Sequence, residues 1–182
     1  GMDVVLHLAS LIAIPHSYHS PYSYLTTNVT GTLNVMEACL NHDIDTVIHT
    51  STSEVYGDTL KMPISESHLQ YAKSPYAATK IGADQIAQSY YSSFGLPVTI
   101  IRPFNTYGPR QTLTPYVGVL TIFINKLLEN KTLTIYGDGQ QTRSFCYVDD
   151  LISAIIKIMN NDGVKGPVNI GNENEITIKT VS

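Results

Sequence analysis

The 182-residue sequence predicts an α/β fold built on a mostly parallel sheet. Three short apolar runs, at residues 3–9, 46–50 and 97–101, have the length of strands and little polar alternation, as strands buried on both faces do. Segments with helical periodicity separate these runs, at about 22–40 and 75–94. The resulting β-α-β-α-β order is typical of parallel strands joined by right-handed crossovers.

The helix predicted at 75–94 has the clearest boundaries. Ser74 is a good N-cap residue, and Pro75 suits the first helical position because it lacks an N–H that would have no partner there. Gly95 follows the last periodic residue and is typical of a helix end. Residues 10–21, which contain two prolines, are predicted to form a loop.

After residue 105 the regular alternation ends. In chain order we expect a helix at 119–129, a strand at 133–136, a helix from about 147 to 159 and a strand at 167–170. The segments between them are rich in glycine, proline and polar residues, which favour turns.

Composition places the chain among soluble globular proteins, with 43% hydrophobic and 14% charged residues. Its formal net charge of −4 provides no basic surface for nucleic acid, and no apolar run reaches the length of a membrane span. No signal-peptide pattern is found, so we expect a cytoplasmic protein in which Cys39 and Cys146 are reduced thiols. His16 and His19 have no further ligand nearby, so no metal site is predicted.

Tyr76 and Lys80 are the first candidate catalytic pair. They lie four residues apart near the start of a predicted helix and therefore share one face of it. Because a neighbouring ammonium stabilises a phenolate, Lys80 is predicted to lower the pKa of Tyr76 and make it a working base. Residues 51–54 add hydroxyls and a carboxylate directly after the strand at 46–50. In a parallel sheet the working residues lie beyond the carboxyl ends of the strands, so these groups are expected to meet.

Several further segments, taken together in their order, carry a family resemblance. They are His7-Leu8-Ala9-Ser10, Asn28-Val29-Thr30-Gly31-Thr32-Leu33-Asn34, Ser51-Thr52-Ser53-Glu54-Val55-Tyr56-Gly57, Tyr76-Ala77-Ala78-Thr79-Lys80, Arg102-Pro103-Phe104-Asn105-Thr106-Tyr107-Gly108-Pro109-Arg110-Gln111 and Gly137-Asp138-Gly139-Gln140-Gln141-Thr142-Arg143-Ser144-Phe145. The chain resembles the extended short-chain dehydrogenase/reductase family, the NAD-dependent epimerases and dehydratases that act on nucleotide sugars. Residues 11–15 and 74–84 are most similar to the retaining UDP-N-acetylglucosamine 4,6-dehydratases.

The resemblance implies an incomplete Rossmann-like, doubly wound sheet. It also implies a partial dinucleotide-binding domain at 1–105 and a mixed segment at 106–182 with substrate-binding elements. The family's glycine-rich turn, which holds the dinucleotide pyrophosphate, has no match here, because the sequence contains no G-x-G-x-x-G. The run at 3–9 resembles the family's fourth strand, so we expect a truncated chain with weak affinity for NAD. That strand would be an open edge, and self-association through it is expected.

The resemblance also implies roles for individual residues. Tyr76 would take the proton of the sugar C4 hydroxyl, Lys80 would bind the nicotinamide ribose, and Thr52 would hydrogen-bond the same hydroxyl. Glu54 and Ser53 stand where the dTDP-glucose 4,6-dehydratases carry a base and an acid. The implied contacts with NAD are Leu8, Ala9, Ser10, Asn28, Ser51, Tyr76, Lys80 and Phe104. The implied contacts with a nucleotide sugar, preferably a UDP-sugar, are Asn105, Arg110, Tyr136 and Arg143. A homo-oligomer is the expected assembly.

Three reactions remain open at this point. Ser53 replaces the aspartate of the dTDP-glucose 4,6-dehydratases, and the order Thr-Ser-Glu is also seen in UDP-glucuronate decarboxylases. The 4-epimerases need no carboxylate at Glu54, so its presence favours a 4,6-dehydratase over an epimerase. The alternative outside enzymes is a non-catalytic chain that binds a nucleotide sugar or a partner chain.

Overall fold

The structure is a computed structural model that describes the whole chain except residues 59–61, 115–117 and 162. Its described residues form two compact units. Unit 1 comprises Gly1–Pro103 and Ile155–Asn169, and unit 2 comprises Phe104–Ala154 and Ile170–Ser182. Compactness assigns no role to either unit, so the functional division at residue 105 stays a prediction.

A four-stranded sheet forms the centre of unit 1, which confirms the α/β fold. Its strands are β1 (Val4–His7), β2 (Thr46–Thr50), β3 (Val98–Pro103) and β7 (Gly166–Ile170), in the order β1-β2-β3-β7. β1 runs parallel to β2 and β2 runs parallel to β3. Within the described residues β1 lies at an edge of the sheet.

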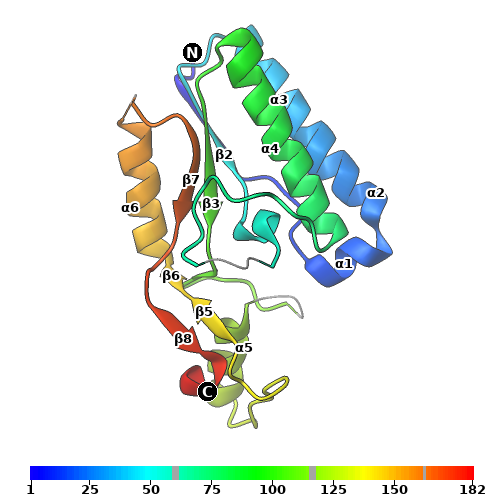
Figure 1. Cartoon of the computed structure of the whole chain (residues 1–182), viewed down its shortest axis with the longest axis vertical. Coiled ribbons are helices and arrows are strands. Elements are labelled where there is room, and N and C mark those ends of the chain that lie inside the picture. The colour runs from blue at the N-terminus through cyan, green and yellow to red at the C-terminus, as the bar shows by residue number, and fades with distance from the viewer. Residues whose placement is uncertain (59–61, 115–117, 162) are drawn as a thin grey trace. The chain divides into compact units, whose positions relative to one another are not determined.

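Helices cover the sheet of unit 1. Those before β3 are α1 (Ile14–His19), α2 (Pro21–Tyr24), a π-helix (Leu25–Thr30), α3 (Gly31–Asn41) and α4 (Pro75–Phe94). In both views α3 and α4 lie side by side, and Figure 1 shows them on one side of β2 and β3. The C-terminal half of α6 (Val148–Met159), from Ile155 on, lies on the other side (Figure 1). The strands therefore have covered faces, as their continuous apolar sequences predict.

The predicted boundaries of α4 are confirmed. The Ser74 hydroxyl accepts a hydrogen bond from the Ala77 backbone N–H at 3.0 Å, which satisfies one of the free N–H groups of the first turn. Pro75 stands in the first turn, and Gly95 ends the helix with the left-handed φ of 72°. The loop predicted at 10–21 is wrong in part, because it contains α1. A proline near an amino terminus starts a helix without losing a hydrogen bond, and Pro15 has this position in α1.

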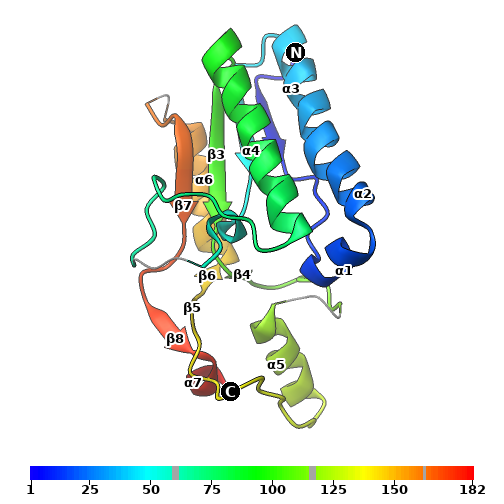
Figure 2. The same cartoon turned by 45° about the vertical axis from the view of Figure 1, so that its right-hand side comes forward.

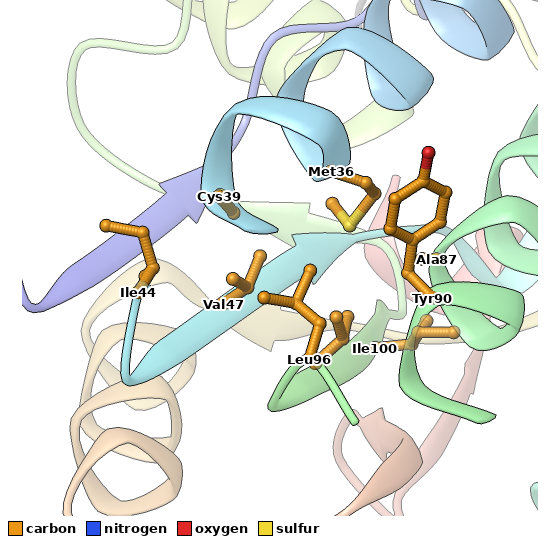
Figure 3. Packing of buried hydrophobic residues seen from close by; sticks show 9 residues of the cluster. Met36, Cys39, Ile44, Val47, Ala87, Tyr90, Leu96 and Ile100 are labelled. Carbon is orange, nitrogen blue, oxygen red and sulfur yellow. The ribbon is translucent and has the colours of Figure 1, made fainter. Parts of the chain in front are cut away.

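The hydrophobic core lies between this sheet and the pair α3 and α4. Figure 3 shows Met36 and Cys39 of α3 on the same side of β2 as Val47, with the Tyr90 ring of α4 beside Met36, and Ala87 belongs to the same cluster. Burying side chains of this kind removes apolar surface from water and is the main source of stability for such a unit. The core therefore fixes α4, and with it the candidate catalytic residues, against the sheet.

Polarity changes along the sheet face that packs on α3 and α4. Side chains on one face of a strand recur every second residue. The row near the amino ends of the strands is apolar, with Val5, Val47 and Val98 in register. In the next row His7 is in register with His49, and Arg102 follows near the end of β3. The same face thus supplies a dry core at one end and buried polar groups at the carboxyl ends.

Unit 2 contains short paired strands and two helices besides α6. Its strands pair as β4 (Thr106–Tyr107) with β6 (Cys146–Tyr147) and β5 (Thr142–Ser144) with β8 (Glu175–Thr177), and its helices are α5 (Val119–Leu128) and α7 (Ile178–Val181). The strand predicted at 133–136 is wrong, because no strand of the described residues pairs with this segment. An apolar run forms a strand only when another strand accepts its backbone hydrogen bonds.

Among the residues that the structure describes, no helix combines the length and the apolar character needed to cross a membrane.

Candidate active site

Thr52 and Glu54 are presented by the turn that follows β2. Residues Ser53–Tyr56 form a 3₁₀ helix, and Thr52 caps it by accepting a hydrogen bond from the Glu54 backbone N–H at 3.2 Å. Gly57 ends the turn with a φ of 60°, and a Cβ at this position would stand 2.3 Å from the Tyr71 carbonyl oxygen. Only glycine fits so close to a neighbouring backbone, so the turn that carries Thr52 and Glu54 depends on it.

Tyr76, in the first turn of α4, meets these two residues. Its side chain is 6% exposed. Burial raises the pKa of Tyr76 to about 12, a hydrogen-bonding interaction with Thr52 opposes this rise, and the Glu54 carboxylate adds to it. Thr52, Glu54 and Tyr76 therefore lie within one environment, as expected for groups at the carboxyl end of β2.

Lys80 is buried one helical turn from Tyr76, with 3% of its surface exposed. Its ammonium donates a hydrogen bond to the Thr50 carbonyl oxygen at 2.7 Å. Burial lowers the pKa of Lys80 to about 8, and the Asp84 carboxylate opposes this shift. An amine with that pKa remains mostly charged at neutral pH.

The prediction that Lys80 lowers the pKa of Tyr76 is wrong for this chain. The pKa of Tyr76 moves upward, because burial of the phenol is the largest influence and the charge of Glu54 acts in the same direction. The Lys80 ammonium is engaged by the Thr50 carbonyl at the end of β2. As it stands, the site holds a neutral phenol beside a charged amine.

The side chain of Asn28, which is predicted to contact the cofactor, already makes hydrogen bonds to other groups of the protein. It lies in the π-helix and is 1% exposed. Its Oδ1 accepts hydrogen bonds from the Leu11 backbone N–H at 2.8 Å and from the Ser10 hydroxyl at 3.0 Å. Its amide nitrogen donates to the Leu11 carbonyl at 3.0 Å and to the Thr79 hydroxyl at 3.1 Å. Asn28 thus ties the loop after β1 to α4, and a direct cofactor contact stays a prediction.

The other predicted cofactor residues of unit 1 differ in exposure. Leu8 and Ala9 are exposed after β1, and Ser10 is half-buried. Ser51 is 7% exposed, and its hydroxyl has no hydrogen-bond partner among the described residues. A buried hydroxyl without a partner costs free energy, so Ser51 is a group that a ligand would satisfy.

A cavity of about 310 Å³ in unit 2 brings together three of the four predicted substrate-binding residues, Asn105, Tyr136 and Arg143. Its wall also includes residues that sequence reasoning missed, among them Gln111, Thr121, Gln141 and Phe145. Asn105 is fixed by donating a hydrogen bond to the Ser144 carbonyl at 2.8 Å. The cavity combines a cationic side chain with amides and aromatic rings, a lining suited to a phosphate group attached to an apolar or planar body.

Two predicted residues of unit 2 lie outside this group. Arg110 does not line the cavity and is exposed in a left-handed conformation with a φ of 66°. Phe104 packs beside Gly171, where an added Cβ would lie 3.2 Å from the Phe104 Cβ. Roles for Phe104 with the cofactor and Arg110 with the substrate remain predictions.

Buried polar residues next to the candidate pair were missed entirely. Asp84, Arg102 and His49 are all less than 5% exposed and lie on α4, β3 and β2. The spacing of Asp84, four residues after Lys80, was the available signal, since such residues share a helix face.

A parallel α/β sheet with a buried tyrosine and lysine beyond a strand end is the arrangement expected of a dinucleotide-dependent dehydrogenase. Comparison with known proteins makes the assignment definite. The chain belongs to the NAD dependent epimerase/dehydratase family, whose model matches residues 1–171.

Individual relatives differ in the reaction their names describe. UDP-glucuronic acid decarboxylase 1 of Arabidopsis thaliana is 38% identical and matches 97% of this chain, which covers 41% of that protein. The solved UDP-N-acetylglucosamine 4-epimerase of Methanobrevibacter ruminantium M1, in complex with UDP-N-acetylmuramic acid, is 37% identical with a TM-score of 0.95, over 98% of this chain and 58% of that one. The dTDP-glucose 4,6-dehydratase DesIV of Streptomyces venezuelae, solved with NAD, is 31% identical with a TM-score of 0.86, over 98% and 55%. The chain thus spans about half the length of these relatives.

The predicted cofactor residues of unit 1 have side chains of the kind that one end of NAD would require. Lys80 offers an ammonium and Ser51 offers a buried hydroxyl without a partner, which suit the hydroxyls of a ribose. The exposed Leu8 and Ala9 offer surface for a planar ring. The pyrophosphate requires a glycine-rich turn, and the sequence of this chain contains no G-x-G-x-x-G.

Proposed function

We propose that this chain carries the acid–base residues of an NAD-dependent nucleotide-sugar 4,6-dehydratase. One observation carries the proposal: the Thr52 hydroxyl and the Glu54 carboxylate both act on the buried phenol of Tyr76. A hydroxyl, a carboxylate and a phenol in one place are the groups needed to move protons at neighbouring carbons of a sugar.

Each residue has a role in the proposed reaction. When bound, NAD supplies the hydride acceptor at the sugar C4 position, and its oxidised ring carries a positive charge. Tyr76 accepts the C4 hydroxyl proton, for which its pKa of about 12 must fall, and a cation beside the phenol has that effect. Thr52 orients the hydroxyl by hydrogen bonding, and Lys80 holds the ribose.

Glu54 serves the elimination. Oxidation at C4 acidifies the C5 proton, and the Glu54 carboxylate takes it while the C6 hydroxyl leaves as water. Ser53 stands where related dehydratases have an acid, so the proton for the departing hydroxyl comes from another donor, for which the neutral phenol of Tyr76 is suited. NAD, when bound, would supply the hydride that reduces C6, and the protonated Glu54 would return its proton to C5, which completes a 4-keto-6-deoxy sugar.

The substrate is proposed to be a UDP-sugar. The cavity of unit 2 offers Arg143 for the diphosphate oxygens, because a guanidinium binds phosphate with two parallel hydrogen bonds. Tyr136 offers an aromatic face for the base, and Asn105 an amide. A homo-oligomer in the cytoplasm remains part of the proposal.

A 4-epimerase is the second candidate, favoured by the TM-score of 0.95 to a solved 4-epimerase. Epimerisation uses the same Tyr76, Lys80 and Thr52 but needs no base at C5. Glu54 is therefore the residue that separates the two reactions.

Product analysis tests the proposal. The protein in its longest natural form is incubated with NAD and UDP-N-acetylglucosamine, and the products are identified by NMR. A 4-keto-6-deoxy sugar is expected, and it should disappear with Glu54→Gln and with Tyr76→Phe. A C4 epimer that persists in Glu54→Gln would establish the epimerase instead, and full activity of Tyr76→Phe would show that the assigned base is wrong.

A further inference from the structure

Asp84 is a buried carboxylate that the proposed reaction does not use. It is 1% exposed and lies on α4 four residues after Lys80, on the same helix face. Its Oδ2 accepts hydrogen bonds from Arg102 Nε at 3.2 Å and Nη2 at 3.1 Å, and from the Gln70 amide at 3.3 Å. Carboxylates are almost never buried so fully without paired charges, and Arg102 provides the paired charge for Asp84.

Arg102 is held as firmly as the carboxylate it binds. It is 4% exposed on β3 and donates a hydrogen bond from Nη1 to the Tyr56 hydroxyl at 2.8 Å. Its guanidinium also lies 5.0 Å from the centre of the Tyr56 ring. The Tyr56 hydroxyl in turn donates to Asn169 Oδ1 at 2.7 Å. Packing and hydrogen bonds therefore hold the Asp84–Arg102 ion pair in a single geometry.

Two histidines from neighbouring strands face the same cluster. His49 Nε2 lies 3.5 Å from Asp84 Oδ1, and the rings of His7 and His49 are 5.4 Å apart. Burial is the largest influence on both and lowers the pKa of each, that of His7 to about 4. With both histidines neutral at pH 7, the charges inside this cluster are the cations Lys80 and Arg102 and the anion Asp84.

We propose that Asp84 is a positioning residue, a buried counter-ion anchored by Arg102 whose charge, one turn along the same face of α4, stabilises the Lys80 ammonium at the active site. This inference rests on the proposed function, in which Lys80 binds the cofactor. What it claims about the molecule is only that Asp84 keeps the Lys80 amine charged. Within the part of the chain that the structure describes, Lys80 donates to one acceptor, the Thr50 carbonyl, so its charge needs a further source of stabilisation in the core. Arg102 binds Asp84 through Oδ2, whereas Oδ1 makes no hydrogen bond within the described residues and has the His49 ring at 3.5 Å, so the carboxylate charge is paired with a cation on one side only.

The test measures the titration of Lys80 directly. The ¹³Cε shift of the Lys80 side chain is followed against pH by NMR in lysine-labelled protein, and Lys80→Met identifies the signal. Asp84→Asn should lower the pKa of Lys80 by about one unit, a tenfold shift towards the neutral amine. Arg102→Met should raise the pKa, because the remaining carboxylate then has Lys80 as its cation. Gln70→Leu removes a hydrogen bond to the same carboxylate without changing charge, and should leave the titration in place.

The double variant Asp84→Asn/Arg102→Met protects the test against a failure to fold, because it removes both buried charges together. Its Lys80 pKa should lie between those of the single variants. The proposal is overturned if no folded variant shifts the titration, or if the Asp84 and Arg102 variants shift it in the same direction. A different result would contradict the proposed function: a Lys80→Met variant that binds NAD with native affinity. That result would not change the titration data, so the two failures can be told apart.

Discussion

Breaking the Asp84–Arg102 pair should cost far more stability than breaking an exposed pair. The side chains of Asp84 and Arg102 are 1% and 5% exposed, and three hydrogen bonds converge on Asp84 Oδ2. In Asp84→Asn the guanidinium of Arg102 stays in the core without a counter-charge. Loss of one partner of a buried pair costs about 3–5 kcal/mol, because the remaining ion can recover neither its partner nor its water. We therefore expect the free energy of unfolding to fall by about that amount.

Urea unfolding followed by circular dichroism measures the change. The matched control is Asp58→Asn, which breaks the exposed pair of Asp58 with Lys73, whose side chains are 78% and 49% exposed. Water solvates the lysine that remains, so the control should unfold with the native midpoint. Asp84→Asn/Arg102→Met should recover part of the loss, since it leaves no unpaired ion. An Asp84→Asn transition indistinguishable from that of Asp58→Asn would refute the reasoning.

Four further outcomes follow from the same structure. The pKa of Lys80 is about 8 in the folded state and near 10.5 in the unfolded state, so the unfolded state binds more protons between these two pH values. The free energy of unfolding should therefore rise with pH across this window. Urea titrations at a series of pH values measure this rise, and Lys80→Met should abolish it. Ser74→Ala should lower the free energy of unfolding by about 1 kcal/mol through loss of the α4 cap, measured by thermal unfolding, with Ser92→Ala on the same helix as control. Calorimetric titration of the isolated chain with NAD should detect weak binding, and micromolar affinity would contradict the expected need for a glycine-rich turn. Light scattering should show self-association that Leu6→Lys on the edge strand β1 reduces, and a monodisperse native monomer at high concentration would contradict it.

Local signals predicted the parts of the fold that local forces decide. The cap at Ser74 and the glycine at 95 set the ends of α4 through hydrogen bonds within one helical turn, and both boundaries are confirmed. The strand predicted at 133–136 failed because its existence depends on a partner strand distant in sequence. α1 was missed for a related reason: Pro15 was taken as a loop residue, whereas at a helix start it costs nothing.

In the candidate site, too, the features set by nearby residues were predicted, and those set by tertiary packing were not. Tyr76 and Lys80 were recognised from their spacing, and Thr52 and Glu54 from their place after a strand. The direction of the Tyr76 pKa was wrong because it depends on burial, which the spacing of two residues does not reveal. Arg102 stands eighteen residues after Asp84, and only the packing of β3 against α4 brings them together.

One helix face explains why core and site adjoin. The residues of α4 that face the sheet run from Tyr76 through Lys80 and Asp84 to Ala87 and Tyr90, from reactive to apolar. The strands repeat this order, with histidines and an arginine towards their carboxyl ends and valines towards their amino ends. Because α4 connects two parallel strands, it runs opposite to them, so its polar start meets their polar ends. The apolar end fixes α4 against the sheet. The charged groups at its other end are therefore held in the protein interior, where the dielectric constant is low and charges interact strongly with one another. A change in Ala87 or Val47 that shifted α4 would for this reason disturb the titration of Lys80 before it removed any contact of Lys80 itself.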